Sequence, residues 1–97
     1  MDWQVVFSLR SKRDLQGIVE FIARDDPGAA HRFGITLIDK AQSLSNAPEM
    51  GPILPQKPDT RFFPVGAYLI IYRADVQRRI VRILRFWHAA RGQRPSR

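Results

Sequence analysis

The chain has 97 residues, 44% of them hydrophobic, and its 16 Lys and Arg against nine Asp and Glu give a net charge of +7. This length fits one domain and leaves no room for a second core. The absence of cysteine excludes disulfides, thiol catalysis and cysteine-ligated metal sites. Such a positive charge on so small a body favours a polyanionic or acidic partner, and it leaves nucleic acid, a ribosome and an acidic protein segment equally open.

The first residues and the longest apolar stretch bear on the cellular compartment. The chain starts without the basic segment and apolar run of a signal peptide. Its longest apolar stretch, residues 67–72, is far shorter than the ~20 residues that span a bilayer. We therefore expect a cytoplasmic protein that does not cross a membrane.

The N-terminal half predicts one strand and two helices. A strand is expected over residues 3–8, where Trp3, Val5 and Phe7 alternate with polar positions. A helix is expected over residues 12–24, with Ser11 as its N-cap and Asp14 completing a capping-box-like pair. A second helix should start at Asp26 and Pro27 and run to Ser45. The apolar residues of both helices recur at helical spacing, so the two should form a hairpin that packs on a flat surface: Leu15, Ile18, Val19, Ile22, Ala30, Phe33, Leu37, Ala41 and Leu44.

The C-terminal half predicts a loop followed by three strands. Residues 46–59 hold four prolines and Gly51, so we expect an ordered surface loop there. Strands are expected over residues 61–65, 67–74 and 79–87, joined by Gly66 and by a turn over residues 75–78. The expected fold is α+β in the order β-α-α-β-β-β, with a helical hairpin on a four-stranded, mainly antiparallel sheet. Residues 1–97 form one domain in this interpretation, with a basic tail at 91–97.

Motifs for catalysis and for cofactors are weak. The sequence contains no G-x-G-x-x-G, P-loop, H-E-x-x-H or G-x-S-x-G pattern. His31 and His88 lie on separate elements without carboxylates at ligand spacing, so we expect no metal site and no cofactor. Asp25 and Asp26 are interpreted as turn and cap residues rather than as paired catalytic carboxylates.

Positive charge is concentrated towards the C-terminus. From residue 73 onward there are eight arginines and one acid, Asp75. The planar fork of arginine suits bidentate contact with phosphate or carboxylate. A solvated basic surface that keeps the protein soluble is the alternative interpretation.

Several segments resemble the ParE/RelE family of bacterial toxins, over nearly the whole chain. In the N-terminal half these are "WQVVFS", "DLQGIVEFIARDDPGAA" and "PEMG". In the C-terminal half, "RFFPVGAYLIIYR" and "IVRILRFWHAAR" are similar to the family's strands, with an Arg-led strand, a Tyr-x-Ile-x-Tyr strand and a closing Leu-Arg-x-x-His-x-x-Arg segment. The order and spacing of these pieces carry the resemblance.

The resemblance implies a toxin of a type II, plasmid-stabilisation-like system, neutralised by an acidic and partly disordered antitoxin that folds on binding. RelE-like members cut mRNA in the ribosome with lysines and arginines plus a tyrosine or histidine. ParE-like members inhibit DNA gyrase and lack that catalytic set.

The chain departs from the nuclease pattern at several positions. Leu69 follows Tyr68 where nuclease members carry an arginine, and Phe62 and Phe63 replace a lysine pair. No tyrosine follows Tyr72. The resemblance therefore favours a ParE-like inhibitor of DNA gyrase with no catalysis of its own. A ribosome-dependent mRNA endonuclease and a basic nucleic-acid-binding module without toxicity are the alternatives.

The candidate site residues follow from these interpretations of the function. The endonuclease alternative would use Arg61, Arg85 and His88. Composition makes the segment from Arg85 onward the candidate for target binding: Arg85, Trp87, His88, Arg91 and Arg94. His88 is interpreted as structural in preference to an acid or base. Phe86 is expected in the core, and Trp87 is left open between core packing and base stacking.

Overall fold

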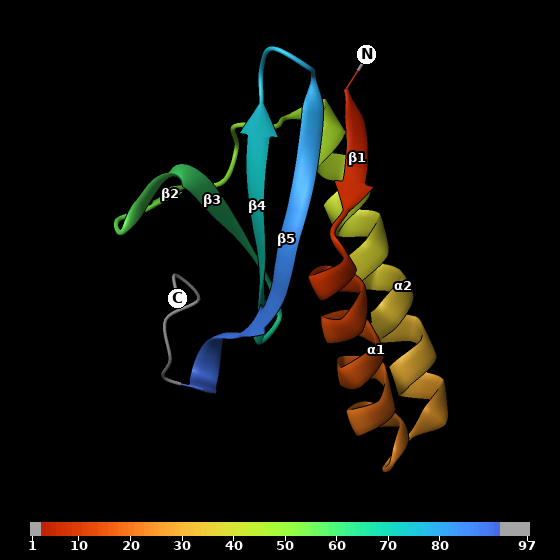
Figure 1. Ribbon diagram of the computed structural model, residues 1–97. Helices are drawn as coiled ribbons and strands as arrows, with labels where there is room; N and C mark the ends of the chain where they lie inside the picture. The colour runs from red at the N-terminus through yellow and green to blue at the C-terminus, as the bar shows by residue number, and fades with distance from the viewer. Residues whose placement is uncertain (1–2, 92–97) are drawn as a thin grey trace.

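The computed structural model describes residues 3–91. Their elements in chain order are β1 (Gln4–Phe7), α1 (Leu9–Ala23), α2 (Pro27–Ser43), the 3₁₀ turn η1 (Leu44–Asn46), β2 (Ile53–Leu54), β3 (Lys57–Val65), β4 (Tyr68–Asp75), β5 (Ile80–His88) and the 3₁₀ turn η2 (Ala89–Arg91). The strands form one sheet in the order β1-β5-β4-β3-β2. β1 is parallel to β5, and the other pairs are antiparallel. Both helices lie on the same side of this sheet (Figure 1).

The predicted α+β class and the helical hairpin against a mainly antiparallel sheet are confirmed. The predicted strand count of four is wrong, because the described chain has five strands. The additional strand, β2, is two residues long and pairs with β3 inside the segment predicted as a loop. Prolines on both sides of it are tolerated because an edge strand leaves one row of backbone groups without a ladder partner.

The start of α1 differs from the prediction. Ser8, not Ser11, is the N-cap, and its Oγ accepts a hydrogen bond from the Ser11 backbone N–H at 2.9 Å. The Ser11 side chain is buried in the first turn and donates to the Ser8 carbonyl at 2.8 Å. Asp14 therefore takes no part in a capping box, and its carboxylate is free for a distant partner. The start of α2 is as predicted, since Asp26 accepts from the Ala29 N–H and Pro27 is the first helical residue.

The core lies between the helical hairpin and the sheet. Leu37 and Leu44 contribute from the helical side, and Ile70, Tyr72 and Ile83 contribute from the strands, all at 0% exposure. Tyr72 also carries a polar group inward, and its hydroxyl accepts from the Gly51 N–H at 3.0 Å. Burial raises the pKa of the Tyr72 phenol, although the hydrogen bond from Gly51 acts in the opposite direction. No helix in the described part of the chain is long and apolar enough to cross a membrane.

Two turns join the three long strands. Gly66, with φ +57°, connects β3 to β4 as predicted, and glycine adopts this left-handed conformation without strain. The β4–β5 turn lies one residue later than predicted, because β4 extends to Asp75 and β5 begins at Ile80, after Arg79 with its positive φ of 56°. Asp75 accepts from the Arg78 N–H at 3.1 Å, which closes the turn.

Candidate functional site

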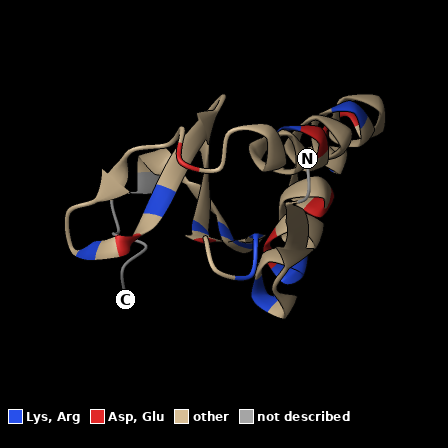
Figure 2. Cartoon of the chain, turned by 90° about the horizontal axis from the view of Figure 1, so that it is seen from above, with Lys and Arg blue, Asp and Glu red and all other residues tan. Residues whose placement is uncertain are grey.

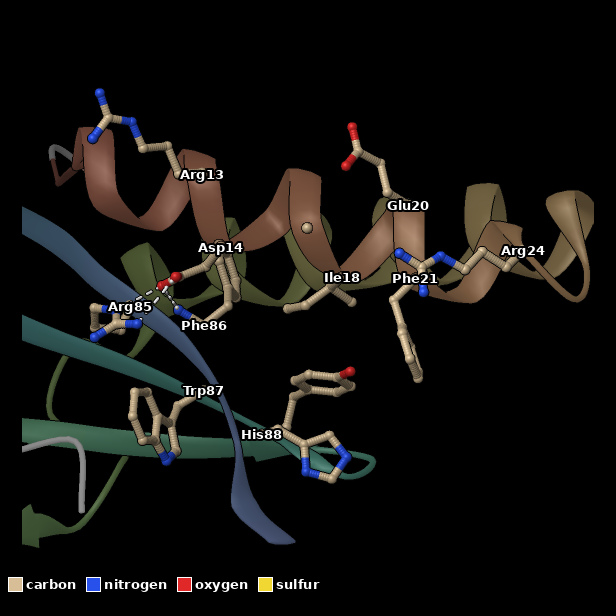
Figure 3. Close-up of a pocket in the computed structure, with 12 residues that line it drawn as sticks. Arg13, Asp14, Ile18, Glu20, Phe21, Arg24, Arg85, Phe86, Trp87 and His88 are labelled. Carbon is tan, nitrogen blue, oxygen red and sulfur yellow. Dashed lines mark hydrogen bonds and ion pairs between the residues drawn. The ribbon is translucent and has the colours of Figure 1, made fainter. Parts of the chain in front are cut away.

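Three of the predicted target-binding residues line one groove of about 410 Å³ between α1 and the C-terminal half of β5. We name it the α1–β5 groove. Figure 3 shows α1 along one side and Arg85, Trp87 and His88 on the strand opposite. The remaining lining residues come from α1, β4 and β5: Arg13, Asp14, Gly17, Ile18, Glu20, Phe21, Arg24, Tyr68 and Phe86.

The groove exists because β1 is shorter than β5. β1 pairs with Gln4↔Ile80 through Phe7↔Ile83, so the rest of β5 has no strand beside it on that edge among the described residues. α1 runs past this open edge instead. The Ser8 N–H donates to the Ile83 carbonyl at 2.9 Å and the Ser8 hydroxyl donates to the Leu84 carbonyl at 3.0 Å. One residue thus caps the helix and attaches it to the strand.

A β-bulge sets which side chains of β5 point towards the helices. Ile71 is opposite Arg85 whereas Tyr72 is opposite Ile83, so Leu84 is the extra residue on β5. Such a bulge shifts the alternation of side chains by one position. Ile83 and Phe86 are therefore both in the core, and Phe86 is 3% exposed, as predicted.

Arg85 is held by two neighbours. Its Nε and Nη2 donate to the Asp14 carboxylate at 2.7 and 3.1 Å. Asp14 Oδ2 also accepts the Phe86 backbone N–H at 3.1 Å, which satisfies a backbone group on the open edge. On the other side, the Arg85 guanidinium carbon lies 4.8 Å from the centre of the Trp87 ring, at cation–π distance. The side chain of Arg85 is 20% exposed, so most of its charge is already engaged inside the protein.

His88 also has partners within the fold. Its ring meets the Tyr68 ring edge-on, with centroids 4.8 Å apart. Its Nδ1 accepts the Ala90 backbone N–H at 3.2 Å, which requires an unprotonated Nδ1. This contact fixes the start of η2 relative to β5, and it supports the structural interpretation of His88.

The helix contributes a feature that sequence reasoning missed. Phe21 is 64% exposed and points from α1 towards the strand side of the groove (Figure 3). The Arg24 guanidinium lies 5.9 Å from its ring. Gly17, one turn earlier, has no atom within 4 Å of an added Cβ, so the groove wall is open there. The signal for Phe21 was present in the sequence, since it is a large apolar residue outside the helical stripe that packs on the sheet.

Arg61 lies apart from Arg85 and His88. It lines a second groove with Arg73, Arg78 and Arg82 and does not line the first. Its Nη1 donates to the carbonyls of Glu49 and Gly51 at 3.2 and 2.8 Å, which holds the loop before β2. The three residues of the endonuclease alternative are therefore not assembled into one site in the described structure.

The remaining two candidates are at the end of the described chain. Arg91 closes η2, and nothing is described of its side chain. Arg94 lies outside the described residues, as does the rest of the tail predicted at 91–97 apart from Arg91.

The basic residues do not gather on one face. Figure 2 shows Lys and Arg positions on the strands as well as on the helices, with acidic positions between them. The described arginines after residue 72 are divided, since Arg85 faces α1 whereas Arg73, Arg78 and Arg82 line the second groove. The described part of the arginine-rich C-terminal region therefore presents its charge in two places, because the bulge and the hairpin turn send these arginines in different directions.

The α1–β5 groove is chemically suited to binding. It combines exposed Phe21 and half-buried Trp87 with three guanidinium groups and two carboxylates. Within residues 3–91, no three His, Cys, Asp or Glu side chains come together as metal ligands would. A segment with apolar and acidic residues would match this lining, because its apolar side chains would cover the rings and its acids would meet Arg13 and Arg24.

Comparisons with known proteins agree on one group. A model of the family described as "ParE toxin of type II toxin-antitoxin system, parDE" matches residues 5–92. The chain is 36% identical over 92 residues to "Toxin RelE1" of Caulobacter vibrioides, covering 91% of this chain and 95% of that protein. Among solved structures, a chain of the toxin–antitoxin complex RelBE2 from Mycobacterium tuberculosis is 26% identical with a TM-score of 0.69, covering 91% of this chain and 99% of that one.

Two further structures show the same fold at lower identity. A chain of the chromosomal ParDE system from P. aeruginosa has a TM-score of 0.75 at 16% identity, covering 89% of this chain and 95% of that one. The isolated RelE toxin of E. coli has a TM-score of 0.59 at 14% identity, covering 94% of this chain and 88% of that one.

Proposed function

Because the chain belongs to the ParE toxin family of type II toxin–antitoxin systems, we propose that it is a toxin that acts by binding DNA gyrase. Gyrase supplies the covalent chemistry on DNA in this proposal, and the toxin supplies only a binding surface. The α1–β5 groove is the surface that we assign to this contact, with Phe21 and Trp87 as its aromatic residues.

The observation that supports binding over ribonuclease chemistry is the engagement of Arg85. Stabilising a phosphoryl transition state requires cations that face the developing charge. Arg85 instead makes a two-point contact with Asp14 and lies over the Trp87 ring. Arg61 donates to two loop carbonyls in another groove, and His88 accepts a backbone N–H. Each candidate for cleavage thus has a structural partner already.

We also propose a cognate antitoxin as a second partner. The net charge of +7 and the mixed apolar and basic lining of the groove favour an antitoxin segment that carries acidic and apolar residues together. Co-expression with the product of the neighbouring gene should yield a stable complex and restore growth of the host. A neighbour that neither binds nor restores growth would contradict this assignment.

The test of the target uses two parallel assays on the purified protein. We expect inhibition of gyrase supercoiling with accumulation of cleaved DNA, and no cleavage of mRNA on translating ribosomes. His88→Ala should retain its toxicity, because the imidazole makes structural contacts here. Codon-dependent mRNA cleavage that is lost in His88→Ala would replace the gyrase assignment by the endonuclease alternative. A protein inactive in both assays and harmless to growth would favour the non-toxic nucleic-acid-binding module.

The assignment of the groove has its own test. Phe21→Ser should weaken gyrase inhibition about tenfold or more, as expected when a central aromatic contact is removed. Ile35→Ser is the matched control, because Ile35 is also an exposed apolar helix residue, at 46%, but does not line the groove. Equal activity of the two variants would show that gyrase binds elsewhere on the toxin.

A further inference from the structure

Two arginines face each other across β4 and β5 near the hairpin turn. Arg73 and Arg82 are direct partners in the antiparallel ladder. Tyr72, Val81 and Ile83, next to them along the strands, are in the core. Side chains alternate along a strand, so Arg73 and Arg82 project from the sheet face that the helices leave uncovered (Figure 1). Like charges directly opposite each other are destabilising, and an anion between them would relieve that repulsion.

These arginines line the second groove introduced above, which we name the hairpin groove. It has a volume of about 410 Å³ and is lined by four arginines (Arg61, Arg73, Arg78, Arg82) and three carboxylates (Glu49, Asp59, Asp75). Asp75 accepts the Arg78 backbone N–H at 3.1 Å and its Nη1 at 3.3 Å, and that backbone N–H is the main cause of a lowered Asp75 pKa. Asp75 is therefore ionised at neutral pH and offsets the charge of Arg78.

The remaining cations of the hairpin groove are poorly neutralised. Asp59 Oδ2 lies 3.4 Å from Arg73 Nε, but this buried Nε makes no hydrogen bond within residues 3–91. The Asp59 side chain is 68% exposed, so water screens the contact. No hydrogen bond or ion pair within 4 Å joins the Arg82 guanidinium to another residue of the described chain, although its charge adds to the lowering of the Asp75 pKa that the Arg78 N–H mainly causes. Arg73 and Arg82 are thus two weakly neutralised cations side by side.

We propose that the hairpin groove binds the phosphodiester backbone of a nucleic acid, with Arg73 and Arg82 sharing one phosphate. Directly opposed residues in a sheet lie about 5 Å apart, close enough for two guanidinium groups to reach one anion. Each of the two non-bridging oxygens of a phosphodiester can accept from a separate guanidinium group, so one phosphate can contact both arginines. DNA and RNA share this chemistry. The site goes beyond gyrase binding, because it contacts nucleic acid directly and lies outside the α1–β5 groove.

The experiment measures binding of the whole toxin to fluorescent duplex DNA and to single-stranded RNA of equal length, by anisotropy over a series of salt concentrations. Neither gyrase nor ribosomes are present, so the result is independent of the proposed function. Arg73→Gln/Arg82→Gln should weaken binding at least tenfold and lower the slope of log affinity against log salt by about one to two, since each neutralised phosphate contributes about 0.7–0.9. Arg10→Gln/Arg32→Gln removes the same charge from exposed helix positions and should change affinity by less than about twofold.

Two outcomes overturn the proposal. Equal losses in both double variants would mean diffuse attraction by net charge. Displacement of the labelled nucleic acid by poly-glutamate as readily as by unlabelled nucleic acid would mean a carboxylate-binding surface. The single variant Arg82→Gln controls for misfolding, because Arg82 makes no hydrogen bond or close ion pair that the described chain would lose. It should still weaken binding at least threefold. A loss confined to DNA or to RNA supports the site and identifies the nucleic acid it takes.

Discussion

Replacing Asp14 by asparagine tests how α1 is attached to the open edge of β5. The carboxylate accepts three hydrogen bonds, two from Arg85 and one from the Phe86 N–H, and the two side chains of the pair are only 16% and 20% exposed. Removing one partner of a fully buried ion pair costs about 3–5 kcal/mol. Because this pair retains some contact with water and asparagine keeps one acceptor, we expect a loss of about 2–3 kcal/mol in the free energy of unfolding.

Urea denaturation measures this loss, and the melting temperature should fall by about 15 °C for a domain of this size. Asp39→Asn is the matched control, since it removes one exposed acid from α2 and should change stability by less than about 0.5 kcal/mol. A double-mutant cycle with Arg85→Gln should return a coupling of about 1 kcal/mol or more. If Asp14→Asn is as stable as Asp39→Asn, the pair does not hold the helix and the reasoning is refuted.

The remaining predictions concern Gly51, Gly17 and Tyr72. Gly51→Ala should lower stability by about 3 kcal/mol or more, because its Cβ would lie 2.3 Å from the Phe62 carbonyl oxygen. Gly17→Ala should raise stability by about 0.5–1 kcal/mol, because Gly17 lies inside a helix with open space around it. Thermal melts of the two variants should therefore shift the melting temperature in opposite directions, and shifts in the same direction would contradict this reasoning. Burial raises the Tyr72 pKa above its ordinary 10.0, so the folded state holds the phenolic proton more tightly and stability should fall as pH rises beyond that value. Tyr72→Phe should cost about 1–3 kcal/mol at neutral pH by leaving the Gly51 N–H unpaired. In urea titrations at alkaline pH, the free energy of unfolding of this variant should fall less steeply with pH. An unchanged slope would mean that groups other than Tyr72 cause the alkaline loss of stability.

Local patterns in the sequence predicted most of the fold. Asp26 and Pro27 carry a start signal that needs no tertiary context, and α2 begins there. Both Ser8 and Ser11 are good N-caps, and the contact of Ser8 with Leu84, 76 positions away, decides between them. No local rule contains that information. β2 escaped prediction because two residues between prolines show no alternation.

The candidate site was predicted in part for similar reasons. Composition was enough to identify Arg85, Trp87 and His88 as candidates, because they lie close together in the sequence. They do line one groove. Asp14 was interpreted as a capping residue because its real partner, Arg85, is 71 residues distant. The separation of Arg61 from these residues depends on how the loop at Gly51 folds back over β3, which a proline-rich sequence leaves undetermined.

The parallel pairing of β1 with β5 has a consequence for how the protein is made. β1, the first strand of the sheet in chain order, pairs with residues 80–83 of β5, the last strand in chain order. β5 is also flanked by strands on both sides, so the sheet cannot form its centre until that strand emerges. Such distant contacts slow folding, and a nascent chain that holds only the helical hairpin still exposes the apolar surface of Leu37 and Leu44. We therefore expect this domain to fold only after β5 has left the ribosome, and ribosome-bound chains that stop before β5 to be degraded rapidly by added protease.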